Sequence, residues 1–369
     1  MSRSLSREEK VYYARQITLP EVGEKGQEKL KNSSVLLIGL GGLGSPLALY
    51  LAGAGIGRIG ICEFDKIEIS NLHRQILYGT SLEGKAKIEA GVQRLKDLNP
   101  YIEIRTYPAL DVSNAREIVQ KYDVVADGAD NFATRYLVND ACVLENRPLV
   151  SASILGFEGQ LSVFHYQNGP CYRCLFPKPP PAGMAPSCNE AGVLGVLPGV
   201  MGTLQATEVI KICLSLGQTV SGKLLTYDAL SLSFSTFEIV RDQQCAICGV
   251  KPTIAELKYE IEVCLNVQQI SAEELYKNKD RYLIIDVRES AERAESFIEG
   301  SLHLPLAIVL SGEEQIPKGK PLILQCAAGG RSQRAAEHLA KNGYAEVFNL
   351  TGGIKAWQAF TNHGRVNRG

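Results

Sequence analysis

The sequence predicts an α/β protein of two domains: a doubly wound, mainly parallel sheet, followed by a smaller α/β domain. Its 369 residues are enough for two or three domains at roughly 150 residues each. Short runs of β-branched residues alternate with helical patterns in the first half, which is typical of parallel strands joined by crossover helices. The same alternation restarts near residue 262. We therefore expect domains at 1–249 and 263–369, with a linker at 250–262.

The elements of the first domain follow from these runs. Apolar strands are expected at 34–39, 57–63, 102–108, 122–128 and 147–153, with helices at 44–54, 84–98, 113–120 and 131–145. After residue 153 the rhythm changes. Later strands, possible antiparallel partners, are expected within 159–166, 222–230 and 233–242, around a loop rich in Pro and Gly at 177–198 and a helix at 199–216.

The second domain repeats the pattern on a smaller scale. Strands are expected at 263–267, 282–289, 321–326 and 346–350, and helices after Ser271, at 332–342 and from 352. Ser271 is a typical N-cap, and Glu274 stands three residues later at the capping-box position.

Composition excludes several classes of function. The 39 basic and 40 acidic residues give a formal net charge of -1, so no overall field attracts nucleic acid or an acidic membrane. The N-terminal segment is polar, unlike a signal peptide, and no apolar run reaches the roughly 20 residues that span a bilayer. We expect a cytoplasmic protein that binds neither nucleic acid nor membrane. Its ten cysteines are then metal ligands, catalysts or core residues rather than disulfides.

A glycine-rich loop, GLGGLG at 39–44, follows the first strand and precedes a helix. Glycines let a phosphate approach the backbone, and the helix N-terminus supplies N–H donors and a positive dipole end. Glu63 ends the second strand about 20 residues later, where a carboxylate can bind ribose hydroxyls. A nicotinamide-dependent dehydrogenase would need little else.

The next segment favours a triphosphate over the pyrophosphate of NAD. Arg74 and Lys87 bring two cations toward the glycine loop. The fourth strand leads into Asp127 and Asp130 at the carboxyl edge of the sheet, where ligands bind and where an aspartate could hold Mg²⁺. The alternative is that Arg74, Lys87 and Asp130 are a solvated surface cluster.

Several spaced motifs carry a family resemblance. YARQI, GLGGLGSP, SNLHRQ, GKAK and DGADN followed by Arg135 resemble the MoeB/ThiF family over roughly residues 5–249. The resemblance implies a Rossmann-like adenylation domain in a homodimeric enzyme. Such an enzyme uses MgATP to adenylate the C-terminal glycine of a small ubiquitin-like sulfur carrier, and it releases pyrophosphate.

Matching positions imply roles for individual residues. Arg15 would reach the phosphates from the other subunit, and Asp130 would hold Mg²⁺ at the reaction centre. The nucleotide-binding positions are Gly41, Glu63 on the ribose, and Asn71, Arg74 and Lys87 on the phosphates. Glu63 is a departure, since the family usually has Asp there; the longer side chain can still accept two hydroxyls, and nearby Asp65 could share the role.

Two C-x-x-C pairs predict a metal site. Cys171 with Cys174 and Cys245 with Cys248 provide four thiolates, the set that holds a closed, structural Zn²⁺. The family resemblance supplies the same pairs. Redox-active dithiols and core cysteines are the alternatives. Cys188, in the loop between the pairs, is either a catalytic or resolving thiol or a dispensable one. The remaining cysteines of the apolar patterns are expected in the core: Cys62, Cys142, Cys213 and Cys264.

A second anion-binding loop follows the strand at 321–326. Backbone N–H groups and a helix dipole converge on Cys326, which stabilises a thiolate. The spacing from Cys326 to Arg331 is C-x4-R, shorter than the C-x5-R of cysteine phosphatases, and it suits a persulfide. With Asp286 and Arg288 upstream and NLTGGIKAW downstream, residues 263–360 resemble a rhodanese domain.

This copy departs from the common rhodanese pattern in two places. The usual Gly-His pair is replaced near 296–300, and the loop carries Ala327 and Ala328 where charged or hydroxyl residues often stand. An inactive rhodanese scaffold is the alternative to a sulfurtransferase, although Cys326 and Arg331 are both retained.

The combination resembles sulfur-carrier activating enzymes of the MoeZ type. It implies that the first domain adenylates a carrier ending in Gly-Gly and that a persulfide on Cys326 then attacks the adenylate. The sulfur would come from a cysteine desulfurase or thiosulfate, and reduction or a thiol such as Cys188 would release the thiocarboxylate. The pathway stays open among molybdenum cofactor, thiamine, cysteine and tRNA thiolation. The alternatives are a nicotinamide oxidoreductase with an accessory rhodanese domain and a non-catalytic carrier-binding scaffold.

Overall fold

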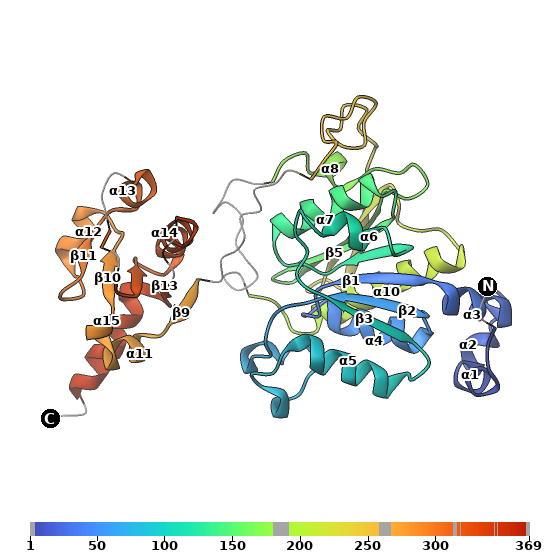
Figure 1. Ribbon diagram of the computed structural model, residues 1–369, viewed down its shortest axis with the longest axis horizontal. Coiled ribbons are helices and arrows are strands. Elements are labelled where there is room, and N and C mark those ends of the chain that lie inside the picture. The colour runs from blue at the N-terminus through green and yellow to red at the C-terminus, as the bar shows by residue number, and fades with distance from the viewer. Residues whose placement is uncertain are drawn as a thin grey trace. The chain divides into compact units, whose positions relative to one another are not determined.

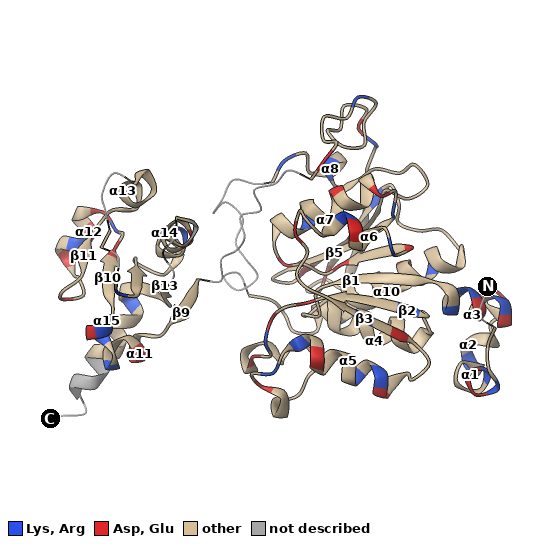
Figure 2. Ribbon diagram, viewed as in Figure 1, with Lys and Arg blue, Asp and Glu red and all other residues tan. Residues whose placement is uncertain are grey.

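The computed structural model describes residues 4–179, 192–257, 267–312, 316–317, 319–342, 344 and 346–366. The chain forms two compact units, Met1–Ile261 and Glu262–Gly369 (Figure 1). The domain limits expected from the sequence stay a prediction. Basic and acidic residues are interspersed along the ribbons of both units, in keeping with the balanced composition (Figure 2).

The first unit is built on an eight-stranded sheet in the order β3-β2-β1-β4-β5-β6-β7-β8. Strands β1 to β5 are parallel, and β5 to β8 are antiparallel neighbours. The strands are β1 (Ser34–Ile38), β2 (Arg58–Cys62), β3 (Glu103–Tyr107), β4 (Val124–Asp127), β5 (Leu149–Leu155), β6 (Glu158–Phe164), β7 (Lys223–Asp228) and β8 (Ser233–Glu238). The predicted doubly wound sheet and its later antiparallel strands are confirmed.

Helices cover both faces of this sheet, as the two apolar clusters of the unit require. One face packs against α4, α5 and α10, and the other against α6 and α7 (Figure 1). The helices are α1 (Arg7–Tyr12), α2 (Ala14–Ile17), α3 (Gly23–Asn32), α4 (Gly44–Ala54), α5 (Lys87–Leu98), α6 (Ala115–Val119), α7 (Phe132–Leu144), α8 (Tyr172–Leu175) and α10 (Leu197–Leu214), with short 3-10 turns η1 (Ile69–Asn71) and η2 (Thr80–Leu82). Helices α1 to α3 were not among the expected elements.

The second unit has a five-stranded parallel sheet in the order β11-β10-β12-β13-β9. Its strands are β9 (Gln268–Ile270), β10 (Leu283–Asp286), β11 (Leu302–His303), β12 (Leu322–Gln325) and β13 (Val347–Leu350). Its helices are α11 (Ala272–Lys277), η3 (Lys279–Arg281), α12 (Ser290–Glu295), α13 (Leu306–Ser311), α14 (Gly330–Lys341) and α15 (Gly353–Val366). The strand expected at 263–267 lies almost wholly outside the described residues.

Local signals account for several of these boundaries. The Ser271 hydroxyl accepts the Glu274 N–H at 3.1 Å, which confirms the predicted cap of α11. Helix α14 begins two residues earlier than predicted, because Gly329 adopts φ +108 and turns the loop directly into the helix. Within the described residues, none of the helices combines the length and the apolar character that crossing a bilayer requires.

Candidate active sites and metal centre

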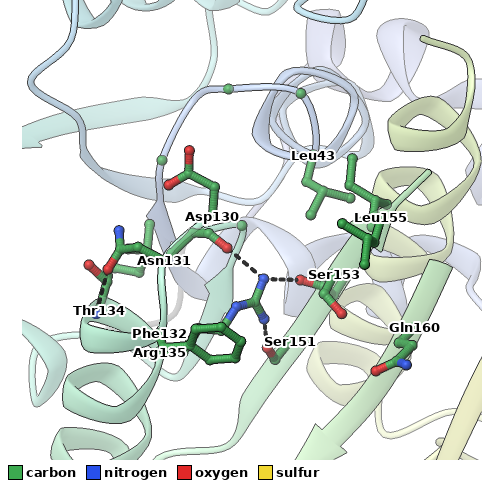
Figure 3. Close-up of a pocket in the computed structure, with 18 of the residues that line it drawn as sticks. Leu43, Asp130, Asn131, Phe132, Thr134, Arg135, Ser151, Ser153, Leu155 and Gln160 are labelled. Atoms are coloured by element: carbon green, nitrogen blue, oxygen red, sulfur yellow. Dashed lines mark hydrogen bonds between the residues drawn. The ribbon is translucent and has the colours of Figure 1, made fainter. Parts of the chain in front are cut away.

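A cavity of about 450 Å³ opens at the carboxyl ends of the parallel strands of the first unit. Its wall is formed by the loop after β1, the end of β2, the start of α5, the loop after β4 and the strands β5 and β6. Figure 3 shows the part of the wall that comes from the loop after β4 and from β5 and β6. Five sequence-predicted residues line it: Gly41, Glu63, Arg74, Lys87 and Asp130. The structure therefore brings together groups that are spread over 90 residues of sequence, at the edge where ligands of such sheets bind.

The loop after β1 approaches its neighbours so closely that only glycine fits at two positions. Gly39 has φ +87, and a Cβ on Gly44 would lie 2.1 Å from the Gly39 carbonyl oxygen. Helix α4 begins at Gly44, so its first N–H groups lie beside this loop. The predicted strand, glycine loop and helix are thus present in that order, as an anion-binding loop requires.

The Glu63 carboxylate connects two loops through hydrogen bonds. Its Oε2 accepts the Leu40 N–H at 2.8 Å, and its Oε1 accepts the N–H groups of Phe64 and Asp65 at 2.8 and 2.9 Å. The side chain is 7% exposed and lines the cavity. Since Oε2 has one remaining acceptor position, Glu63 can take a ligand hydroxyl while it holds the glycine loop.

The two predicted phosphate cations are held by neutral and acidic partners. The Arg74 guanidinium donates to Asn71 Oδ1 at 2.6 Å, so the side chain of Asn71 orients that of Arg74. Lys87 is 4% exposed and its Nζ lies 3.0 Å from Asp65 Oδ2. Asp65 is itself 47% exposed. A bound phosphate group could therefore replace Asp65 as the partner of Lys87. Water would then solvate the Asp65 carboxylate, so the free-energy cost of breaking the ion pair is small.

The loop after β4 places Asp127 and Asp130 in different environments. Asp130 is exposed at the cavity, whereas the Asp127 carboxylate is buried and receives the Ala129 N–H at 2.8 Å and the Ser151 hydroxyl at 3.1 Å. Burial raises the pKa of Asp127, and the Arg135 guanidinium at 3.6 Å opposes that shift. Asp127 therefore shapes the loop, and Asp130 is the aspartate available to a ligand.

Arg135 holds the loop after β4 in place through hydrogen bonds, a role that the sequence patterns did not predict. Its guanidinium donates to the Ala129 and Ala152 carbonyl oxygens and to the Ser151 hydroxyl (Figure 3). The Asn131 side chain accepts the Thr134 N–H at 2.8 Å and caps α7. Asp130 thus stands between two anchored residues. Sequence patterns do not predict this network, because Asp127 and Ser151 lie far apart in the sequence.

Three predicted site residues either do not line the cavity or lie outside the described residues. Arg15 is exposed on α2 and does not line the cavity. Asn71 does not line it either, although its side chain binds Arg74, which does. Cys188 lies outside the described residues, as does Cys264. The other predicted core cysteines, Cys62 and Cys142, are buried, and burial raises the pKa of the Cys62 thiol to about 12. Cys213 is partly buried, with its pKa also raised to about 12 by burial.

The four paired cysteines form one cluster. Their sulfur atoms all lie within 4.8 Å of one another, although the pairs come from distant segments. The sulfur of Cys171 lies 3.6 Å from that of Cys245, and the sulfur of Cys174 lies 3.4 Å from that of Cys248. A hydrogen bond between Cys171 and Cys174 lowers the pKa of Cys174 to about 5 and raises the pKa of Cys171. Four sulfurs at these separations fit one tetrahedral metal ion.

The two residues between Cys171 and Cys174 anchor this cluster to α7. The Tyr172 N–H donates to Asn139 Oδ1 at 2.8 Å. Arg173 makes a two-pronged ion pair with Asp140, with Nε–Oδ1 and Nη2–Oδ2 distances of 2.8 Å, and it lies over the Tyr136 ring. Burial raises the pKa of Asp140 and the arginine opposes the shift. The metal cluster is therefore joined to the helix that begins beside Asp130.

The cysteine loop of the second unit surrounds a buried sulfur. Cys326 is 2% exposed, and its Sγ accepts the Gly329 N–H at 3.1 Å and lies 3.3 Å from the Ser332 hydroxyl. Burial by itself raises the pKa of Cys326, but hydrogen bonds from Ser332 and from the backbone of Ala328 and Gly329 outweigh it, so that the pKa is lowered. The predicted thiolate-stabilising loop is present.

Arg331 forms an ion pair with Glu292, a partner that the sequence patterns did not predict. Its guanidinium binds both carboxylate oxygens of Glu292 on α12, with Nη1–Oε2 and Nη2–Oε1 distances of 2.7 and 2.5 Å. This hydrogen bonding lowers the pKa of Glu292 to about 2 and raises the pKa of Arg331. The side chains are each 35% exposed, so the pair forms the rim of the loop.

Asp286 and Arg288 are structural. The Arg288 guanidinium binds both Asp286 oxygens at 3.0 and 2.7 Å and donates to the Ser296 carbonyl oxygen at 2.6 Å. Arg293 adds a contact of 3.3 Å to the same carboxylate. Burial raises the pKa of Asp286, but hydrogen bonds from Arg288 outweigh it and the pKa is lowered. This closed ion cluster positions α12, and with it Glu292.

Comparison with known proteins places this geometry in a family. A model of the ThiF family matches residues 13–248. The chain belongs to the ThiF family. A model of the rhodanese-like domain matches residues 271–360, so this ThiF-family chain also carries a rhodanese domain. Both resemblances inferred from the motifs are confirmed.

Curated relatives share this two-domain arrangement of the ThiF-family chain. It is 43% identical over 396 residues to the adenylyltransferase and sulfurtransferase MOCS3 of Sus scrofa, a match that covers 96% of this chain and 87% of the relative. It is 51% identical over 258 residues to the sulfur carrier protein adenylyltransferase of Thermus thermophilus, which covers 68% of this chain and 95% of the relative.

Solved structures agree on the adenylation fold of the first unit. The E. coli MccB structure aligns with a TM-score of 0.57 and 25% identity, over 69% of this chain and 75% of that chain. A structure of E. coli MccB with ATP aligns with a TM-score of 0.52 and 26% identity, over 60% and 68% of the two chains.

Proposed function

We propose that this protein adenylates the C-terminal glycine of a ubiquitin-like sulfur carrier with ATP and then converts the adenylate into a thiocarboxylate. One observation carries the adenylation step: the glycine loop, Arg74, Lys87 and Asp130 line a single cavity at the carboxyl edge of the sheet. The names of the two relatives, an adenylyltransferase with sulfurtransferase and a sulfur carrier protein adenylyltransferase, support the substrate class.

The chemistry requires no side-chain nucleophile. A carboxylate repels nucleophiles because it is negatively charged, and ATP removes this obstacle by forming a mixed anhydride with AMP. The carrier carboxylate attacks the α-phosphorus, and pyrophosphate leaves. Arg74 and Lys87 would neutralise charge that builds up on the leaving phosphates, while the backbone of the glycine loop and Gly41 hold the nucleotide. Glu63 would bind the ribose through its free acceptor position.

Two metal ions fit the residues present. Mg²⁺ would bind the phosphates next to Asp130, whose exposed carboxylate is the kind of oxygen ligand that it prefers. Zn²⁺ would bind the four clustered cysteine sulfurs and stabilise the fold, since four sulfur ligands leave no open position for a substrate. Both identities are part of the proposal.

Cys326 would carry the transferable sulfur as a persulfide. The anionic outer sulfur attacks the carbonyl carbon of the adenylate, AMP leaves, and an acyl disulfide joins the carrier to Cys326. A second thiol, for which Cys188 is a candidate, then attacks the Cys326 sulfur of that disulfide. The carrier leaves as a thiocarboxylate, and the enzyme keeps an ordinary disulfide that an external dithiol must reduce. The lowered pKa of Cys326 and the buried loop support a persulfide site.

Mass spectrometry of the carrier tests this function. The protein is incubated with MgATP, a candidate carrier ending in Gly-Gly, a dithiol, and either thiosulfate or a cysteine desulfurase with cysteine. Replacement of oxygen by sulfur adds roughly 16 mass units to the carrier. Carriers of molybdenum cofactor biosynthesis are compared with those for thiamine, cysteine and tRNA thiolation.

The Cys326→Ala variant separates the two steps. It should still exchange pyrophosphate into ATP in the presence of the carrier, yet leave the carrier mass unchanged. The same mass gain in Cys326→Ala would remove Cys326 from the scheme. No exchange in the unaltered protein with any carrier, together with bound NAD, would favour an oxidoreductase instead.

Arg15 would complete the site of a second subunit in a homodimer. Its exposed position on α2, away from the cavity of its own chain, supports this role. Arg15→Ala and Asp130→Ala should each abolish carrier-dependent exchange. A one-to-one mixture, dissociated and reassembled, should recover about a quarter of the activity, since half of the dimers are mixed and one of their two sites is intact. No recovery would place Arg15 in the site of its own chain, whereas full activity of Arg15→Ala would place it outside any site.

A further inference from the structure

A hydrogen-bond chain runs from the buried sulfur of Cys326 to the surface of the second unit. The Ser332 hydroxyl lies 3.3 Å from Cys326 Sγ, 2.7 Å from Asn349 Oδ1 and 3.1 Å from the Gly329 carbonyl oxygen. Ser332 is fully buried and Asn349 is 5% exposed. A hydroxyl carries a single proton, so Ser332 can satisfy only one of these acceptors fully at a time.

The orientation of the Asn349 amide is fixed by acceptors further along the chain. Gln269 Nε2 donates to the Val267 carbonyl oxygen at 3.0 Å, and a carbonyl can only accept. Gln269 Oε1 must therefore face inward, where it accepts Asn349 Nδ2 at 3.0 Å. This leaves Asn349 Oδ1, an acceptor, against the Ser332 hydroxyl.

The hydrogen bonds at the outer end of this hydrogen-bond chain run in the same donor-to-acceptor direction. Gln269 Nε2 also donates to Gln333 Oε1 at 2.9 Å, and Gln333 Nε2 donates to the carboxylate of Glu337 at 2.8 Å. A carboxylate, like a carbonyl, only accepts. Two acceptor-only groups thus impose one direction on every amide between them, and that direction ends at Ser332.

We propose that Asn349 is a positioning residue that competes with Cys326 for the hydroxyl proton of Ser332 and so opposes formation of the Cys326 thiolate. With a neutral sulfur, the proton binds Asn349 Oδ1, because an amide oxygen is a stronger acceptor than an uncharged sulfur. With a thiolate, the proton turns to the sulfur and Asn349 Oδ1 is left buried without a donor, which is unfavourable. The chain therefore favours states in which Cys326 Sγ is uncharged.

This competition suits a sulfur carrier better than a permanent thiolate. In the persulfide of the proposed function, the negative charge lies on the outer sulfur and Sγ is neutral, so the proton of Ser332 can remain with Asn349. The loaded state then satisfies both residues, whereas the empty thiolate satisfies only one. Asn349 would thereby shift the balance from the empty thiolate toward the loaded loop.

The charged groups around Cys326 are unchanged by this mechanism. Arg331 on α14 interacts with the Cys326 charge, and Glu292 on α12 binds Arg331. On β10, Asp286 is closed into its cluster with Arg288 and Arg293. Glu337 on α14 faces Gln333. The neighbouring strand β13 contributes only the neutral Asn349, and variants at that position leave all of these charges in place.

The test is the pH dependence of Cys326 alkylation by iodoacetamide in the full chain, followed by mass spectrometry of the Cys326 peptide. Asn349→Leu, which keeps the side-chain volume, should lower the midpoint by about one pH unit, because Ser332 then donates to the thiolate without leaving an unpaired acceptor. Ser332→Ala should raise the midpoint. In the Ser332→Ala background, Asn349→Leu should have no further effect.

Two surface variants keep the test decisive if Asn349→Leu does not fold. Gln269→Leu, at an exposed position, frees the Asn349 amide to rotate and should lower the midpoint as well. Gln333→Leu is the matched control and should leave it unchanged, since Val267 still orients Gln269. An unchanged or higher midpoint in Asn349→Leu or Gln269→Leu, or an equal fall with Ser332→Ala present, would overturn the proposal. Alkylation needs no ATP, carrier or sulfur donor, so failure of the proposed function would not affect it.

Discussion

The glycine loop after β1 takes its charged side chains from other segments, whereas the cysteine loop after β12 carries its own arginine and binds it to Glu292. Both loops connect a parallel strand to the N-terminus of a helix, and in the second loop the Gly329 N–H donates to Cys326 Sγ. In the first loop, Arg74, Lys87 and Asp130 face an open cavity. In the second loop, Cys326 Sγ is buried, and Arg331 is paired with a carboxylate, as Lys87 is with Asp65 in the first unit.

Under the proposed function, this difference follows from what each loop would hold. A nucleotide is large and polyanionic, so its charges would be met by groups gathered from several elements, and no group of the loop itself would react. A persulfide is small and covalently attached, so the second loop would have to contain the sulfur. One strand-loop-helix design would then serve binding in the first unit and covalent chemistry in the second.

The largest expected effect separates the two loops directly. Lys87→Met should reduce carrier-dependent exchange of pyrophosphate into ATP by about a hundredfold, because a charge at the leaving phosphates is lost. Alkylation of Cys326 should be unaffected. Lys85→Met, an exposed lysine in the same GKAK segment, is the matched control and should exchange normally. Equal loss in both variants would show that Lys87 has no specific role.

Loss of the metal should be felt mainly by the first unit. Cys174→Ser should lower the bound zinc, measured by atomic emission, from about one ion per chain to almost none. The first unit should lose several kcal/mol of stability and show a lower melting temperature, while the alkylation midpoint of Cys326 in the second unit stays the same. Cys213→Ser is the control. Full zinc content in Cys174→Ser would contradict the four-cysteine site.

A smaller effect concerns the rim of the cysteine loop. Glu292→Gln should lower the melting temperature of the second unit by a few degrees, since solvent screening of a pair that is 35% exposed on each side limits it to about 1 kcal/mol. The pKa of Glu292 is lowered from 4.5 to about 2, so this contribution is complete above pH 4.5 and disappears as the pH falls through 2.

Melting curves between pH 7 and pH 2 check that pH dependence. The difference between the unaltered protein and Glu292→Gln should be constant down to pH 4.5 and then shrink. Glu295→Gln, at the end of the same helix α12, should show no such difference. A gap that grows toward low pH would have the wrong sign for this ion pair.

The smallest expected effect is on stability, at the last strand residue before each of the two loops. Strand β1 ends with Ile38, whereas β12 ends with Gln325, which is fully buried and has no hydrogen-bond partner for either amide atom within the described residues. Gln325→Leu should therefore raise the free energy of unfolding by less than about 1 kcal/mol. Urea denaturation measures it. A marked loss of stability would show that the amide is satisfied.

Sequence patterns predicted the sheets well and the side-chain partners poorly. Buried parallel strands are continuous apolar runs, so β1, β2 and β4 could be located directly, and the two C-x-x-C pairs indicated their own cluster. Contacts between distant segments left no local signal: Arg135 with Ser151, Glu292 with Arg331, and Asn349 with Ser332. The short helices α1 to α3 also lack an apolar period long enough to recognise.

The anchoring of the four-cysteine cluster to α7 places a spectroscopic probe on that helix. This helix of 13 residues is roughly 20 Å long; Asn139 and Asp140 bind the Cys171–Cys174 turn, and Asn131 caps its start beside Asp130. The proposed ligand site at Asp130 and the four sulfurs are thus attached to the same helix. Cobalt bound to the four sulfurs would report their coordination geometry in its visible spectrum, without a label on the proposed nucleotide site.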